Sequence, residues 1–394
     1  MKFNFDEIID RNGTDAYKLE LREKTFGKSD VIPLWVADMD FAAPPAVVEA
    51  IQKRASHPVF GYTVRTRKFN DAIVNWLKTR HNWEIRSSWI EFSPGVVTGL
   101  ALTVLAYTKP GDGIIIQPPV YPPFFSVVKD NSRRMVFNTL TNENGRYEID
   151  FKELEELASD PQNKMMILSS PHNPVGRLWT KDELMRIADI CIKNDVLIIS
   201  DEIHSDLALY DNVHIPIASL DNGIANNCIT FMAPSKTFNI AGFSTSYMVC
   251  SNRELMIKYK RTLNRLHLYT GNLFGGVILE SAYSEGAGWL DSLKTYLEGN
   301  TDLVYDFIKE RLPFIEMEKP EATYLLWLDF RKTGFDQKKL VSFLVNDANV
   351  GMNDGLMFGE AGRGFMRMNI GSPRSVIQKA LENIENASIK AGLK

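Results

Sequence analysis

Apolar runs alternate with amphipathic stretches from about residue 46 to about residue 285, and this alternation constrains the fold more than any other feature of the chain. It is typical of repeated β-α-β units, which form a mostly parallel sheet with helices on its faces. We therefore expect an α/β fold. Strands are predicted at residues 89–92, 113–116, 164–168, 196–200, 228–232 and 243–250, and clear helices at 152–158 and 181–193.

The chain has 394 residues, which is too long for one ordinary hydrophobic core, so two domains are expected. A second region begins near residue 290, with helices at 289–311, 337–347 and from 374 onward, and strands at 324–329 and 365–370. We predict an irregular N-terminal segment at 1–45 that packs with the small domain, a large domain at 46–288 and a small α+β domain at 289–394.

Composition argues against several classes of protein. The formal net charge is −4 without a long run of one sign, so no nucleic-acid partner is expected. The N-terminus lacks the apolar core of a signal peptide, and no apolar stretch approaches the roughly 18 residues of a membrane span. The six histidines show no metal-binding spacing. The three cysteines are far apart in apolar surroundings, which indicates core residues in a reducing compartment, so we expect a cytoplasmic protein without a metal site.

Residues with ligand-binding potential follow five of the predicted strands: Gly95, Tyr121, Asn173, Asp201 and Lys236. In open α/β sheets, ligands bind just beyond the carboxyl ends of the strands. A helix that starts at Gly95 would present free backbone amides to a phosphate. The other four would add an aromatic ring, an amide, a carboxylate and an amine to the same crevice.

Each of these residues also has an ordinary interpretation. Lys236 could be a surface lysine, Gly95 a helix cap, Tyr121 a packed loop aromatic, Asn173 a turn residue and Asp201 an N-cap. Their occurrence at five consecutive strand ends favours one shared ligand instead. Pyridoxal phosphate matches the set, since it has an aldehyde for a lysine, a pyridine nitrogen for a carboxylate, a phenolic oxygen for an amide, a flat ring and a phosphate.

Longer motifs support this interpretation. Residues 169–176 (S-S-P-H-N-P-V-G) resemble the N-P-x-G loop of the fold-type I pyridoxal-phosphate enzymes, the aminotransferase class I/II superfamily, and Ser235-Lys236 resembles its Schiff-base lysine. The resemblance extends from about residue 30 to the end. It implies an aspartate aminotransferase-like fold, with a mostly parallel seven-stranded sheet flanked by helices in a large domain, and a smaller α+β domain.

The chain is most similar to the cystathionine β-lyase group of MalY and PatB type. Residues 35–41 (W-V-A-D-M-D-F), 60–63 (F-G-Y-T) and 201–206 (D-E-I-H-S-D) resemble the signatures of that group. The resemblance implies that Lys236, next to Ser235, binds the cofactor and removes the substrate's α-proton. Asp201 would pair with the pyridine nitrogen, and Tyr121 would stack on the ring.

The remaining roles are also implied by the resemblance. Asn173 would bond the phenolic oxygen, with His204 on the same side. The backbone amides of Gly95, Val96 and Val97 would hold the phosphate. Tyr62 would reach the phosphate of the neighbouring subunit, which implies a homodimer.

Arg367 would bind the substrate α-carboxylate with a bidentate fork, although a surface strand arginine is the alternative. The chain departs from many relatives at Ser244, where they carry a basic residue, and at Ala233, where they carry a serine. Both changes predict contacts with the phosphate that are weaker or are supplied by other residues.

The activity that the resemblance implies is α,β-elimination from cystathionine, cysteine or similar amino acids, which yields a thiol or sulfide, pyruvate and ammonia. Two alternatives stay open. One is an aminotransferase, which uses the same residues. The other is a MalY-like modulator of a transcription regulator, for which the sequence shows no distinct surface patch.

Overall fold

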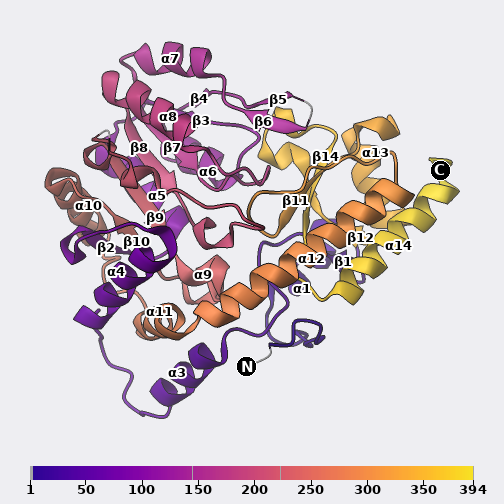
Figure 1. Cartoon of the computed structure of the whole chain (residues 1–394), viewed down its shortest axis with the longest axis horizontal. Coiled ribbons are helices and arrows are strands. Elements are labelled where there is room, and N and C mark those ends of the chain that lie inside the picture. The colour runs from indigo at the N-terminus through magenta and orange to yellow at the C-terminus, as the bar shows by residue number, and fades with distance from the viewer. Residues whose placement is uncertain (1–2, 144, 222, 394) are drawn as a thin grey trace.

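A seven-stranded sheet organises the larger part of the computed structural model, which describes residues 3–143, 145–221 and 223–393 (Figure 1). The strands stand in the order β2-β10-β9-β8-β7-β3-β4. β10 is antiparallel to both of its neighbours, and the other pairs are parallel. The expected mostly parallel seven-stranded sheet is therefore confirmed. The strands are β2 (Ile90–Ser93), β3 (Gly113–Ile116), β4 (Arg134–Phe137), β7 (Asn163–Ser169), β8 (Leu197–Asp201), β9 (Cys228–Met232) and β10 (Ser246–Val249).

Helices cover both faces of this sheet, because successive residues of a strand point to opposite faces. In β3, Ile114 and Ile116 pack into one hydrophobic core and Ile115 packs into the other. The first core also contains side chains of α5 (Val96–Tyr107), α6 (Pro123–Lys129) and α10 (Arg253–Arg265). The second contains side chains of α4 (Arg67–His81), α7 (Phe151–Ser159), α8 (Lys181–Lys193) and α11 (Leu273–Glu285).

A smaller antiparallel sheet lies beside the large one, in the order β11-β14-β13. Two helices, α12 and α14, run side by side over this part of the chain (Figure 1). The elements are α12 (Ala287–Arg311), β11 (Leu325–Asp329), α13 (Gln337–Ser342), β12 (Val350–Gly351), β13 (Asn353–Asp354), β14 (Phe365–Asn369) and α14 (Arg374–Lys390). A separate hairpin consists of β5 (Thr141–Glu143) and β6 (Arg146–Glu148).

The N-terminal segment is more regular than predicted. It contains α1 (Tyr17–Glu20), α2 (Arg22–Phe26) and β1 (Ile32–Pro33), and α3 (Pro45–Ala55) follows it. β1 pairs in parallel with β12, so the chain's first strand is hydrogen-bonded to the region beyond residue 289. Short elements of this kind form through tertiary contacts, and therefore leave little periodic signal. The division at residues 45 and 288 stays a prediction.

Two strands of the large sheet differ from the prediction by more than one residue at an end. β4 was not predicted because it is an edge strand in which Val136 is the one buried side chain among its four residues. The strand expected at 243–250 is shorter, because residues Ala241–Phe243 form a 3-10 turn and Ser244 adopts a left-handed conformation with φ 45°. Within the described residues, no helix is long and apolar enough to span a bilayer.

Candidate active site

A cavity of about 260 Å³ lies at the carboxyl ends of β7, β8 and β9. β8 and β9 are buried along their whole length, and β7 is buried except at Lys164 near its start, so their apolar runs end where polar side chains begin. Because parallel neighbours end at the same edge, the residues that follow them meet there. The predicted residues that line the cavity are Gly95, Val96, Val97, Tyr121, Asn173, Asp201, His204, Ser235 and Lys236.

Lys236 extends into this cavity from α9 (Pro234–Thr237), one helical turn that follows β9. Its Nζ donates a hydrogen bond to the carbonyl oxygen of Ala37 at 2.6 Å. Burial, and next the charge of Arg367, lower the pKa of the Lys236 amine to about 8. A substantial fraction of this amine is therefore neutral near physiological pH, as a nucleophile or base requires.

Asp201 ends β8, between β7 and β9. Its carboxylate accepts one hydrogen bond, from the backbone amide of Ile203 at 3.2 Å. Burial raises the pKa of the Asp201 carboxyl to about 7. A buried carboxylate that accepts so few hydrogen bonds is suited to a ligand that brings a positive charge or a proton donor.

Arg367 in β14 contacts the cavity wall through Asn173. Its Nη1 donates to Asn173 Oδ1 at 2.9 Å, and its Nη2 donates to Asn353 Oδ1 at 2.7 Å. Its Nε has no hydrogen-bond partner among the described residues, although the side chain is buried. The arginine is therefore not a surface residue, and it keeps a donor free for an anion.

His204 follows Asp201 by one turn and is also buried. Its Nδ1 lacks a hydrogen-bond partner within the described part of the chain. Burial lowers the pKa of the His204 imidazole to about 3, so the ring is neutral. Buried polar atoms without partners are uncommon, and here they indicate that a ligand completes the site.

The start of α5 lines the same cavity and is suited to bind an anion. Gly95 precedes the helix with φ 149°, a conformation that favours glycine. The first amides of the helix have no intrahelical partner, and together with the helix dipole they attract an anion. Ala233 and Ser244, the two positions at which the sequence departs from many relatives, line the same cavity. Hydroxyl groups of Thr98, Ser235 and Ser246 are also present there.

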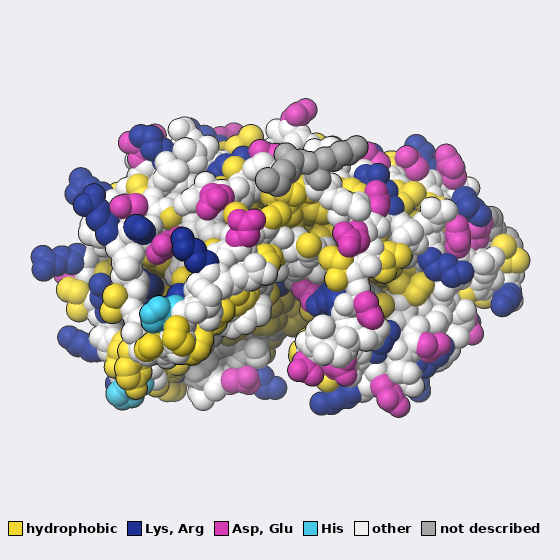
Figure 2. Space-filling model, turned by 90° about the horizontal axis from the view of Figure 1, so that it is seen from below, with side chains coloured by type: hydrophobic (Ala, Val, Ile, Leu, Met, Phe, Trp, Pro, Cys, Tyr) yellow, Lys and Arg dark blue, Asp and Glu magenta, His cyan; other side chains and the backbone are white. Residues whose placement is uncertain are grey.

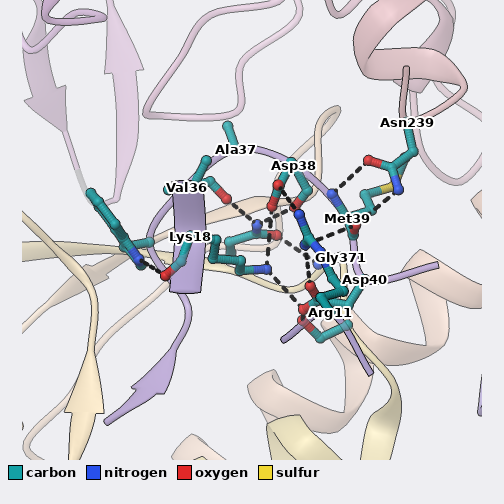
Figure 3. Close-up of polar contacts among 12 residues, drawn as sticks. Arg11, Lys18, Val36, Ala37, Asp38, Met39, Asp40, Asn239 and Gly371 are labelled. Carbon is teal, nitrogen blue, oxygen red and sulfur yellow. Dashed lines mark hydrogen bonds and ion pairs between the residues drawn. The ribbon is translucent and has the colours of Figure 1, made fainter. Parts of the chain in front are cut away.

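The N-terminal strap, by which we mean residues 35–41, contributes Ala37 to the lining of the cavity. Figure 3 shows Asn239, three residues after Lys236, facing Met39 of the strap. The Asn239 amide accepts from Met39 N at 3.0 Å and donates to the carbonyl oxygens of Met39 and Phe41, each at 2.8 Å. The loop that carries the lysine is thereby bonded directly to the strap.

Two acidic residues of the strap are held by two basic residues that precede it (Figure 3). Arg11 contacts Asp38 at 2.7 Å and Asp40 at 2.6 Å, and the fully buried Lys18 contacts Asp40 at 2.8 Å. Burial would raise the pKa of the Asp40 carboxyl, but the charge of Lys18 keeps it below its ordinary value. Asp40 also accepts from Ser372 Oγ at 2.6 Å, so the strap is bonded to the smaller part as well.

Tyr62 does not line the cavity of its own chain, as far as the described residues go, and its side chain is fully exposed. Sequence reasoning missed two other contributors. Ala37 was within a recognised signature, but nothing in the pattern placed its carbonyl beside the lysine. Ser246 was missed because β10 is antiparallel, so its first residue, not its last, reaches the site.

The donor set fits pyridoxal phosphate. An amine with a lowered pKa, a buried carboxylate and an amide lie around one cavity, which a helix N-terminus and hydroxyl groups also line. The unpartnered atoms of His204 and Arg367 further indicate that polar groups of a ligand belong there. None of these contacts with the cofactor requires a metal ion.

Comparison with known proteins gives the same result. The family described as aminotransferase class I and II matches residues 29–384. The chain is 42% identical to cystathionine β-lyase PatB of Bacillus subtilis, over 98% of this chain and 99% of PatB. It is 38% identical to cystalysin from Treponema denticola, whose crystal structure contains pyridoxal 5'-phosphate; the TM-score is 0.96, with 100% of each chain covered. The pyridoxal-phosphate-bound C–S lyase from Staphylococcus hominis is 35% identical, with a TM-score of 0.91 and 98% of each chain covered.

Proposed function

Because the chain belongs to the aminotransferase class I and II family, we propose that it is a pyridoxal-phosphate-dependent carbon–sulfur β-lyase. Its reaction is α,β-elimination from cystathionine, cysteine or similar amino acids, with a thiol or sulfide, pyruvate and ammonia as products. The observation that carries the proposal is the buried amine of Lys236, whose pKa is lowered to about 8 at the carboxyl ends of the central strands. The names of PatB and of the Staphylococcus hominis enzyme support the type of reaction.

The positions of the residues support the following proposed roles. When bound, pyridoxal phosphate supplies an aldehyde for an amine and a ring that takes up the electrons of the broken C–H bond. Lys236 holds the cofactor until substrate arrives, and its freed amine then removes the proton from the substrate's Cα. Asp201 keeps a proton on the pyridine nitrogen, since its carboxylate is buried at the end of β8 and almost unpartnered. Loss of a thiolate from the neighbouring β-carbon completes the elimination, and water hydrolyses the released aminoacrylate to pyruvate and ammonia.

Binding and orientation are assigned to the other residues. Arg367 binds the substrate α-carboxylate, and Asn173, which accepts from Arg367 Nη1, keeps its amide nitrogen for the phenolic oxygen of the ring. His204 lies on the same side. Tyr121 stacks on the ring. The amides of Gly95, Val96 and Val97, with the hydroxyl of Ser235, hold the phosphate.

We also propose a homodimer in which Tyr62 reaches the phosphate of the neighbouring subunit. The segment between α3 and α4 carries Val59, Phe60 and Val64, each at least 60% exposed. Figure 2 shows the face that carries α3, and hydrophobic side chains gather at its lower left. Large exposed apolar side chains on one segment are typical of a surface that another chain covers. Sedimentation of the purified protein tests the dimer, and a monomer with full cofactor affinity would contradict it.

One experiment tests the reaction. Purified protein is incubated with cystathionine or cysteine without a keto acid. Equal amounts of pyruvate and of thiol or sulfide are expected. Turnover that requires an added keto acid would instead identify an aminotransferase. A cytoplasmic location stays a prediction, supported by three free, buried cysteines.

A further inference from the structure

The motif at residues 201–206 contains a second aspartate that the proposed reaction does not use. Asp201 lines the cavity, whereas Asp206 lies in the 3-10 turn Ser205–Leu207 and is absent from the cavity wall formed by described residues. Its side chain is only 3% exposed. A buried carboxylate needs partners, and the identity of those partners indicates what Asp206 does.

The partners of Asp206 come from two directions. Oδ1 contacts Trp76 Nε1 at 2.9 Å and His81 Nε2 at 2.8 Å, both on α4. Oδ2 accepts a hydrogen bond from Thr237 Oγ1 at 2.8 Å. Burial alone would raise the pKa of the Asp206 carboxyl, but the hydrogen bonds and charge of His81, with the bonds from Thr237 and Trp76, keep it below its ordinary value. Asp206 is therefore an anion that connects α4 to Thr237.

Thr237 is the residue directly after Lys236, and it ends α9. A helix of four residues is too short to be stable by itself, so contacts with its surroundings must hold it. Ala233 at its N-cap provides no side-chain hydrogen bond. Thr237 is completely buried and is not among the described residues that line the cavity, and its hydroxyl bonds the helix to Asp206.

We propose that Asp206 is a positioning residue for Lys236: its carboxylate holds the Thr237 hydroxyl and so fixes the turn from which the lysine reaches the cavity. The amine is then constrained at two points. Ala37 accepts from Nζ, and Asp206 fixes the backbone one residue further on. This inference rests on the proposed function, because it assumes that Lys236 is the residue that binds the cofactor and moves the proton.

The test compares Thr237→Val, which removes the hydroxyl but keeps the shape, with Thr237→Ser, which keeps the hydroxyl. Thr301→Val is the matched control, since Thr301 is also fully buried and its hydroxyl donates to Leu297 O within the distant α12. Each holoenzyme is examined for kcat and KM with cystathionine. The visible absorbance of the lysine-bound cofactor is also titrated with pH, which needs no substrate.

For Thr237→Val we expect kcat to fall about tenfold with KM within twofold, because displacement of a catalytic group by a fraction of an ångström has effects of this size. The pH midpoint of the absorbance should also shift by about half a unit or more. Thr237→Ser and Thr301→Val should stay within about threefold of the parent in kcat, with an unchanged midpoint.

The inference would be overturned if Thr237→Val and Thr301→Val had the same kcat and the same pH midpoint of absorbance. If Thr237→Val does not retain cofactor, the same comparison is made with Thr237→Ala, and parental kcat and midpoint in that variant would also overturn it. If the parent protein shows no elimination at all, the proposed reaction is wrong. The absorbance titration then still decides whether Thr237 positions the lysine.

Discussion

The amine of Lys236 lies 2.6 Å from the carbonyl oxygen of Ala37, which belongs to the N-terminal strap. The same oxygen accepts from the hydroxyl of Tyr324 at 2.9 Å. A residue near the start of the chain therefore provides the acceptor for an amine in its middle. That acceptor is available whenever the amine is not bonded to the cofactor.

Replacement of Lys236 by Ala should abolish elimination. We expect kcat to fall by at least about a thousandfold, since the variant lacks both the covalent attachment and the base. Lys152→Ala is a suitable control, because that lysine side chain is 89% exposed on α7. Pyruvate release measures activity in both. If the protein also regulates a transcription factor through its surface, that role should survive in Lys236→Ala. Loss of regulation together with activity would show that the regulatory role depends on catalysis.

Replacement of Asn239 by Gly should loosen the strap. Asn239 has φ 55°, which glycine also adopts, so the variant removes three hydrogen bonds without straining the backbone. We expect kcat/KM to fall about tenfold, and hydrogen exchange at residues 35–41 to become faster. The control is Asn82→Gly, another substitution of an asparagine with positive φ, which lies at the exposed end of α4. Equal rates of hydrogen exchange at residues 35–41 in the two variants would show that Asn239 does not hold the strap.

Replacement of Arg367 by Lys should affect substrate binding more than chemistry. Lysine keeps the charge but cannot bond Asn173, Asn353 and a carboxylate in one plane. We expect KM to rise roughly 10- to 100-fold, with kcat changed by less than about fivefold. Arg363→Lys, at an exposed arginine, provides the control. An unchanged KM would mean that another residue binds the α-carboxylate.

Replacement of Asp201 by Asn should stabilise the cofactor-free protein while it impairs the enzyme. The pKa of Asp201 is about 7 in the folded chain and near 3.8 when unfolded, so the folded state binds more protons between these values. Stability from this group is therefore lost as pH rises from about 4 to 7, and asparagine avoids that loss. We expect a Tm about 2–4 °C above the parent at pH 8, and a smaller difference at pH 4. A parent Tm equal to or above that of the variant at pH 8 would contradict this.

The strand-end residues could be predicted from the sequence, because buried parallel strands leave a strong pattern. β3 and β9 begin and end where the apolar runs do. Asp201 is the last residue of β8, and Lys236 follows the last residue of β9 by four positions. Burial on both faces makes such strands continuously apolar, so their ends are easy to locate.

Other parts of the site could not be derived from local pattern. The strap is irregular, and Ala37 contributes a backbone atom that any residue possesses. Asn353 lies in a segment without periodicity, and its contact with Arg367 joins two strands of the small sheet. Asp206 was visible within a motif, but only the fold shows that its carboxylate accepts from Thr237 and that, among the described residues, it is not part of the cavity lining.

The pairing of β1 with β12 and the bonds of the strap determine where the enzyme can be shortened. A fragment that starts at α3 would retain every strand of the large sheet, yet it would lack Ala37, which lines the cavity and whose carbonyl accepts from Lys236 Nζ. Removing Arg11 as well as α1 would leave Asp38 and Asp40 without their cations. Protease nicking before residue 41 is therefore expected to inactivate the enzyme without unfolding its sheet, and N-terminal fusions are safest when they leave Arg11 onward untouched.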